Sequence, residues 1–183
     1  MKKLGFIFVL AIATIACKNE KKEDITNSDE VKEQVAPAEE KKDNITITVS
    51  AIVPNDDEFV IHYTEEEGFN FNGKDKILID IKGSESAQDI VFDLPEKVLP
   101  ANIMFKVGQN NPKDVTINYI TFDNNNGSAF EISKDLFFQF FNPNKFIDFN
   151  RENNTFTSKE IEGKHEPTFF ARPGLIQKIE EEM

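Results

Sequence analysis

The sequence has few of the residues on which metal centres, disulfide frameworks and most active sites depend. Its 183 residues include one cysteine, two histidines and no tryptophan. A single cysteine cannot form an internal disulfide, and neither His62 nor His165 has a second ligand at the spacing of a zinc site. We interpret both histidines as solvent-facing or locally hydrogen-bonded, with His62 on the outward side of a strand.

Recognisable catalytic motifs are also missing. The sequence contains no GxSxG, no glycine-rich phosphate loop and no dinucleotide fingerprint. Catalysis by paired carboxylates would leave no trace beyond acidic residues, which are abundant in this chain. We therefore predict that the protein is not an enzyme, and we keep a small hydrolase with acidic catalytic residues as an alternative.

Basic residues are outnumbered by acidic ones. With 33 acidic and 21 basic residues, the formal net charge is −12, which disfavours nucleic acid as a partner because phosphate backbones would repel the protein. Acidic clusters at residues 56–58 and 65–67, and a stretch at 123–127 similar to a calcium loop, leave calcium as a candidate ligand, since calcium binds carboxylate and carbonyl oxygens. Solvated loop tips are the alternative, and we predict no other cofactor or metal.

The N-terminal residues have the pattern of an export signal. Lys2 and Lys3 precede an apolar run over residues 4–15, which ends in Ala16 and Cys17. The run is shorter than the roughly 20 apolar residues that cross a bilayer. We predict a signal peptide over residues 1–16.

This segment resembles the signal of bacterial lipoproteins, in which cleavage before a cysteine accompanies lipid attachment to its sulfur and its new amino terminus. Ala16 and Cys17 match that pattern, whereas Thr14 and Ile15 depart from it. The resemblance covers residues 1–17 and implies lipidation of Cys17, including palmitate-type acyl chains, and anchoring to a membrane. The alternative is an ordinary signal peptide cut after Ala13 or Ala16.

Residues 17–43 are rich in Lys, Glu, Asp and Asn and contain few large apolar side chains. Such a segment cannot bury enough surface to offset its conformational entropy, so we predict a disordered tether. Lys18 stands where retained inner-membrane lipoproteins carry aspartate, which implies the outer membrane. Residues 22–24 resemble the export tags of surface lipoproteins of Gram-negative bacteria, with a plain charged linker as the alternative, so the periplasmic and surface sides both stay open.

From residue 44 the apolar residues recur with a period of two, which predicts an antiparallel β-sandwich over residues 44–183 with jelly-roll topology. The predicted strands are short and separated by turn residues, including an Asn-rich hairpin at 124–127: 44–51, 58–64, 76–82, 89–94, 103–107, 115–121 and 129–132. Phenylalanine, with 18 residues, buries a large area without needing a hydrogen-bond partner, so most of these rings should lie in the core.

The last third of the chain mixes helical and extended signals. Ser133 is a suitable N-cap for a helix over residues 134–141, whose stripe of Leu136, Phe137, Phe140 and Phe141 would plug one end of the sandwich. Phe146, Phe149 and Phe156 indicate a further extended segment or hairpin. Residues 173–183 predict a terminal helix beginning at a proline.

Four short segments, HYTE at 62–65, KGS at 82–84, DLPE at 93–96 and VG at 107–108, resemble β-sandwich modules of exported Gram-negative proteins. Such modules resemble carbohydrate-binding sandwiches in shape. The resemblance implies a fold and transfers no activity to these residues.

The candidate ligand-binding residues lie in a polar loop and at one aromatic cluster. Phe69, Asn70 and Phe71 could stack on a sugar or peptide while hydrogen-bonding its edges, with Tyr63 nearby as a further aromatic ring. The alternative is a short strand that directs both phenylalanine rings into the core. Arg172, beside Phe169 and Phe170, is a second candidate.

These features predict a membrane-anchored, non-enzymatic binding or scaffolding module of the bacterial cell envelope. Its partner would be an envelope protein or a glycan. A carbohydrate-binding accessory lipoprotein of a surface polysaccharide system is the alternative within the binding class.

Overall fold

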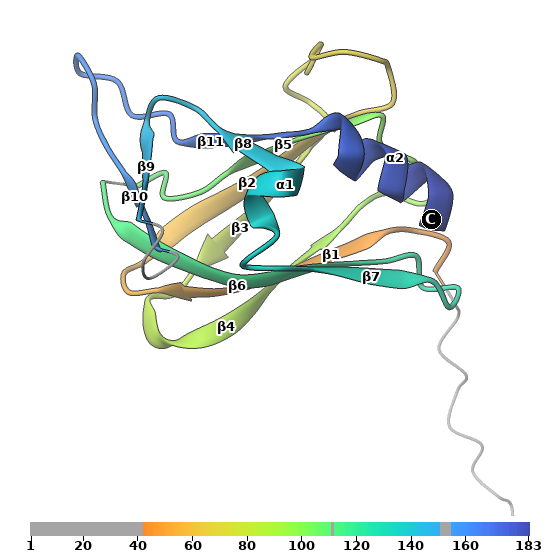
Figure 1. The fold of residues 1–183 in the computed structure, drawn as a ribbon, viewed down its shortest axis with the longest axis horizontal. Helices are drawn as coiled ribbons and strands as arrows, with labels where there is room; N and C mark the ends of the chain where they lie inside the picture. Colours follow the sequence, from red (N-terminus) through yellow and green to blue (C-terminus); the bar gives the residue numbers. More distant parts are fainter. Residues whose placement is uncertain (1–41, 111, 151–154) are drawn as a thin grey trace, which may run out of the picture. The chain divides into compact units, whose positions relative to one another are not determined.

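A computed structural model describes residues 42–110, 112–150 and 155–183. These residues form two antiparallel sheets with a shared hydrophobic core (Figure 1), which confirms the predicted all-β sandwich. The predicted signal peptide, Cys17 and all but the last two residues of the predicted tether lie outside the described residues.

The strands are more numerous than the sequence predicts, and β4 and β6 are longer than their predicted ranges. The first sheet has the order β4-β1-β6-β10-β9, with β7 also paired to β6: β1 (Thr46–Val53), β4 (Ser84–Asp93), β6 (Asp114–Asp123), β7 (Ala129–Ser133), β9 (Ile147–Asn150) and β10 (Thr155–Ser158). The second has the order β3-β2-β5-β11-β8: β2 (Asp57–Thr64), β3 (Lys76–Ile81), β5 (Asn102–Lys106), β8 (Phe141–Pro143) and β11 (Thr168–Ala171).

The strand pairs are nested in the sequence: β2 pairs with β3 in one sheet, and β1 and β4, which flank them in the chain, pair in the other. β1 and β2 lie in different sheets; β1 pairs with β4 and β6, while β2 pairs with β3 and β5. β10 and β11 continue the scheme by pairing with β6 and β5. All of these pairings are antiparallel, as expected for the predicted β-sandwich.

The core forms because alternate residues of both sheets face one another. Phe92 in β4 contacts Phe105 in β5 with ring centroids 6.2 Å apart, and Phe156 in β10 contacts Phe169 in β11 at 5.0 Å. Each pair joins one sheet to the other. The largest fully buried side chains are mainly phenylalanines, as predicted: Phe59, Phe92, Phe105, Phe122, Phe141 and Phe169.

The predicted helix over residues 134–141 is wrong in its extent. Helix α1 spans only Phe137–Phe140, and Ser133 ends β7 instead of capping a helix. The backbone N–H of Lys134 donates to the Asn118 carbonyl at 3.0 Å, which keeps the chain beside β6 at the point where the helix was expected to begin. Sheet pairing therefore outweighs the helical pattern in this segment.

The predicted aromatic plug is correct in part. Phe137 and Phe141 are buried in the core, whereas Leu136 is 40% exposed and lies outside it. Phe141 belongs to β8, where it pairs with Ala171 of β11. This pairing ends the helix, because the backbone of Phe141 cannot be helical and pair as a strand at the same time.

The C-terminal third adds four short strands and a helix. The predicted hairpin around Phe149 and Phe156 corresponds to the pairing of β9 with β10, while β8 and β11 were not predicted. Helix α2 (Pro173–Glu182) confirms the predicted terminal helix. It contributes Leu175 and Ile179 to the core.

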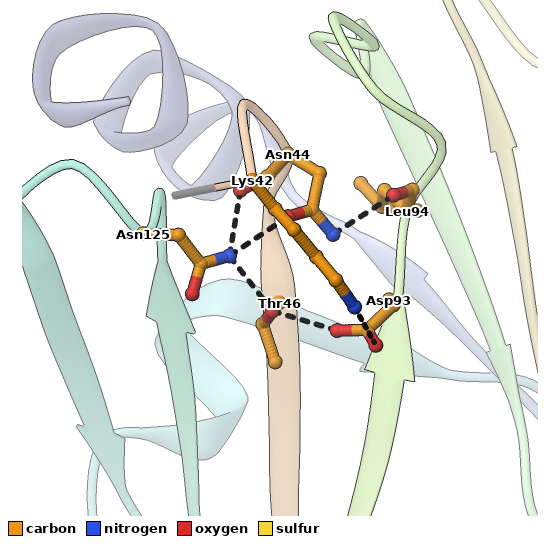
Figure 2. Close-up of polar contacts among 6 residues, drawn as sticks. All are labelled: Lys42, Asn44, Thr46, Asp93, Leu94 and Asn125. Carbon is orange, nitrogen blue, oxygen red and sulfur yellow. Dashed lines mark hydrogen bonds and ion pairs between the residues drawn. The ribbon is translucent and has the colours of Figure 1, made fainter. Parts of the chain in front are cut away.

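An asparagine cluster fixes the chain where β1 begins (Figure 2). Asn125 Nδ2 lies 2.9 Å from the Asn44 carbonyl and 3.0 Å from Thr46 Oγ1. Asn44 Nδ2 donates to the Leu94 carbonyl at 3.1 Å, and Thr46 Oγ1 donates to Asp93 at 2.7 Å. These residues, which we call the Asn44 clasp, join the confirmed β6–β7 hairpin to β1 and β4.

Gly83 allows two turns to approach closely. A Cβ atom on this residue would lie 2.6 Å from the backbone of Asn55 and 2.8 Å from the Pro54 carbonyl. Because backbone atoms cannot swing aside, we expect Gly83→Ala to lower the free energy of unfolding by about 2 kcal/mol, measured by urea denaturation.

Gly174→Ala is the matched control. Gly174 lies in the first turn of α2, and a Cβ there would meet no atom within 4 Å. We expect this variant to be as stable as wild type or more stable by about 0.5 kcal/mol, because alanine favours helix. Equal destabilisation of the two variants would contradict the steric explanation.

Candidate functional site

The outer face of the second sheet, which points away from the core, carries a row of strand side chains. Ile61, Phe105 and Phe169 face inward and are buried, so the residues next to them in sequence face outward. The outward row crosses all five strands through paired residues: Lys76, His62, Met104, Phe170 and Asn142.

The loop of residues 65–75 lies over this outer face. It is drawn in yellow in Figure 1, beyond the sheet that contains β5, β8 and β11. The Phe69 ring meets Phe170 edge-on with centroids 6.0 Å apart, and the Phe71 ring meets His62 at 6.4 Å. The two rings therefore rest outside the sandwich, and the alternative of a strand that buries them is wrong.

Hydrogen bonds hold the loop in this position. Asn102, which is buried in β5, donates its Nδ2 to the Gly68 carbonyl at 2.9 Å. Asn72 Oδ1 accepts the backbone N–H groups of Lys74 and Asp75 at 2.7 and 3.1 Å. Because the loop is braced in this way, Phe69 is presented without a large loss of conformational entropy on binding.

Phe69 is the most exposed large apolar side chain of the described residues, at 64%. The exposed Phe69 ring is supported on one side, because the Phe170 ring packs against it edge-on. An exposed aromatic ring held by a second ring can contribute a large apolar contact to a partner.

Arg172 extends the same surface. It follows Phe170 by two residues in the extended chain; its Nη2 donates to Asn142 Oδ1 at 3.0 Å and its Nε to the Phe141 carbonyl at 3.3 Å. Phe69, Phe170, Asn142 and Arg172 thus form one continuous surface, which we call the aromatic patch. The structure brings together Phe69 and Arg172, which lie more than 100 residues apart in the sequence.

The remaining predicted ligand-binding residues are separated from this patch. Asn70 is exposed and Phe71 half-buried, and both line an open acidic hollow with Glu65, Glu66 and Asp75. The hollow lies on the loop itself. These two residues therefore present a different, more polar surface from the one built around Phe69.

Tyr63 is not available as an exposed aromatic platform. Its side chain is only 8% exposed and belongs to the core, because β2 alternates and Tyr63 shares the inward side with Phe59 and Ile61. Burial, together with the nearby charges of Asp75 and Glu65, raises the pKa of Tyr63. Its assignment as a ligand-binding residue is corrected on these grounds.

His62 faces outward, as its strand position predicts. Burial beneath the loop and the charges of Lys106 and Lys76 lower the pKa of His62 from its usual value of 6.5. The imidazole is therefore neutral at pH 7, where it supports Phe71 as an uncharged ring. His165 Nδ1 lies 3.3 Å from the Gln109 carbonyl, so its hydrogen bond reaches a residue far away in the sequence instead of a local one.

In two of the three candidate calcium segments an aspartate accepts hydrogen bonds from backbone N–H groups. Asp57 is buried, and its Oδ1 accepts the N–H groups of Glu58 and Asn110 at 2.8 and 3.1 Å. Asp123 accepts the N–H of Asn125 at 2.7 Å. Among residues 42–110, 112–150 and 155–183 there is no group of three or more His, Cys, Asp or Glu side chains that could hold a metal.

Asn142 and Phe170 complete the aromatic patch, and sequence reasoning did not assign Asn142. It lies in β8, a strand with three residues and no clear alternation. Its position in the sequence could have indicated this placement. Asn142 lies between the inward-facing Phe141 and Pro143, where the strand ends, so it would face outward.

Comparison with family models, with curated proteins and with solved structures found no match. Neither helix within the described ranges is long and apolar enough to cross a membrane.

Proposed function

We propose that this protein is a lipid-anchored, non-enzymatic binding module of the bacterial cell envelope, which binds a protein or glycan partner through the aromatic patch. The observation that carries the proposal is the exposed Phe69 ring, held against Phe170 by a loop that Asn102 pins to the sheet. The lipoprotein-like signal ending at Cys17 supports the anchor.

Several features favour binding over hydrolysis. The carboxylates of the acidic hollow, Glu65 and Glu66, are exposed, whereas a general acid needs an environment that keeps it protonated. The aromatic patch instead combines an apolar ring pair with an amide and a guanidinium. Such a combination is typical of the central contacts of binding surfaces.

A glycan partner is the second form of the proposal, in the setting of a surface polysaccharide system. The amide of Asn142 beside the Phe170 ring favours it, because sugars present hydroxyl groups at the edge of an apolar face. A protein partner would use the same rings as an apolar anchor.

Binding to isolated cell envelopes tests the proposal. Labelled protein that lacks the predicted signal peptide and carries Cys17→Ser, so that neither the apolar segment nor a lipid contributes, is mixed with envelopes, and the bound fraction is measured against concentration. We expect Phe69→Ala to weaken binding by about tenfold or more, the size of effect given by a central aromatic contact. Protease treatment of the envelopes should remove a protein partner, and periodate oxidation a glycan partner.

Leu99→Ala is the matched control, because Leu99 is 45% exposed and belongs to neither the aromatic patch nor the loop. We expect it to bind as well as the parent protein. Loss of binding by the same factor in both variants, or no effect of Phe69→Ala, would refute the assigned surface.

A further inference from the structure

A hollow lies beside the aromatic patch, between the edge strands of the two sheets. β8 ends the second sheet and β9 ends the first, and α1 lies near both. The hollow is lined in part by Asn142 and Arg172, which also belong to the aromatic patch. It therefore continues that surface around the edge of the sandwich.

Aromatic rings form the apolar wall of this hollow. Phe138 from α1 and Phe149 from β9 lie with ring centroids 4.1 Å apart at an angle of 49°, and both remain half-exposed. They are two of the partly buried rings packed against the core. Their outer sides offer two apolar ring faces, inclined to each other, against which the apolar face of a sugar ring can pack.

The polar wall carries a cation without an acidic partner. Arg172 is the only arginine of the described residues, and none of their carboxylates lies within 4.0 Å of it. Asp148, the acid that lines the hollow, is instead paired with Lys159 at 2.5 Å. Because Lys159 pairs with Asp148, the charge of Arg172 is not balanced by the one carboxylate that lines the hollow.

The guanidinium of Arg172 is oriented but not saturated. Two of its five N–H donors are used, by the Phe141 carbonyl and Asn142 Oδ1. These bonds fix the plane of the group, and its other donors remain for a ligand. An oriented guanidinium with open donors is suited to bind a carboxylate through two parallel hydrogen bonds.

We infer that this hollow binds a uronic acid residue of an acidic saccharide. Its carboxylate would pair with Arg172, its apolar ring face would rest on Phe138 and Phe149, and its hydroxyls would hydrogen-bond Asn142 and Asp148. A neutral sugar would leave Arg172 without a counter-charge. An apolar carboxylate without hydroxyls would leave Asn142 and Asp148 without new partners.

This inference rests on the proposed binding function, but it uses a different contact from Phe69. The two can fail separately. Phe69→Ala tests the envelope-binding surface, whereas the comparison below tests only the hollow.

An NMR titration of the protein that lacks the predicted signal peptide and carries Cys17→Ser tests the inference with two matched ligands. Methyl β-D-glucuronide and methyl β-D-glucoside differ in having a carboxylate or a neutral CH₂OH group at the same carbon. We expect the glucuronide to shift amide signals around Phe138, Phe149 and Arg172, and to bind about tenfold more tightly than the glucoside, as one charge-assisted pair predicts. Equal affinities, or no shifts at these residues, would overturn the inference.

Variants of the cation supply the second measurement. Arg172→Gln should reduce glucuronide affinity by about tenfold and leave glucoside affinity unchanged, while Arg172→Lys should give an intermediate loss, because lysine keeps the charge without the planar fork. Lys164→Gln, at an exposed lysine of the segment between β10 and β11, removes the same charge away from the hollow and should have no effect. If Lys164→Gln and Arg172→Gln weaken binding equally, attraction is non-specific and the inference is refuted.

Discussion

Phe169→Ala is expected to lower the free energy of unfolding by about 4 kcal/mol, a loss typical of deleting a fully buried aromatic ring. Phe169 has no exposed surface, and its ring lies 4.9 Å from that of Phe137 and 5.0 Å from that of Phe156. It therefore joins β11 of one sheet to β10 of the other and to α1. Urea denaturation followed by circular dichroism measures the change.

Phe69→Ala is the control for this prediction, since it removes the same atoms from a ring that is 64% exposed. We expect its stability to remain within about 0.5 kcal/mol of wild type, as for most surface substitutions. If both variants lost the same stability, the placement of Phe169 at the junction of the sheets would be wrong.

Cys17→Ser is expected to abolish lipid incorporation, because the variant lacks the sulfur to which the lipid would be attached. If Cys17 carries three acyl chains, at about 0.8 kcal/mol for each buried methylene, dissociation would be negligible for the lipidated form. Growth with an alkyne-tagged fatty acid, followed by coupling to a fluorophore, measures incorporation directly.

Thr14→Ser is the matched control because it changes the same signal segment and keeps the cysteine. It should be labelled as strongly as wild type. Labelling of Cys17→Ser at the wild-type level would refute the proposed anchor, and it would leave the proposal for the aromatic patch untouched.

The sandwich was predictable because its central strands alternate cleanly. Ile47 and Val49 face inward at the expected spacing, and β1 and β2 agree with their predicted ranges to within two residues. Residues 134–141 misled the prediction because their apolar spacing suits a helix, while the hydrogen bond from Lys134 to Asn118 depends on a strand far away in sequence. The spacing of apolar residues indicates the local preference of a segment for helix or strand. It does not indicate hydrogen-bond partners that lie far away in the sequence.

The candidate site was predictable only in part. Phe69 and Arg172 were singled out for their chemistry, but the sequence could not show that Phe170 would lie between them. Phe169 and Phe170 are adjacent and identical, so their order alone does not reveal which one faces the core. The pairing of β11 with β5 decides it, by placing Phe169 opposite the buried Phe105.

The Asn44 clasp has a mechanical consequence for a protein held by its N-terminal segment. β1 starts directly after the clasp and lies between β4 and β6, so tension applied at Lys42 acts along a strand bonded on both sides. Antiparallel hydrogen bonds run across the strands, so such a pull shears many of them together instead of opening them one at a time. If the proposed anchor holds the domain, it does so through a strand whose geometry resists extraction under load.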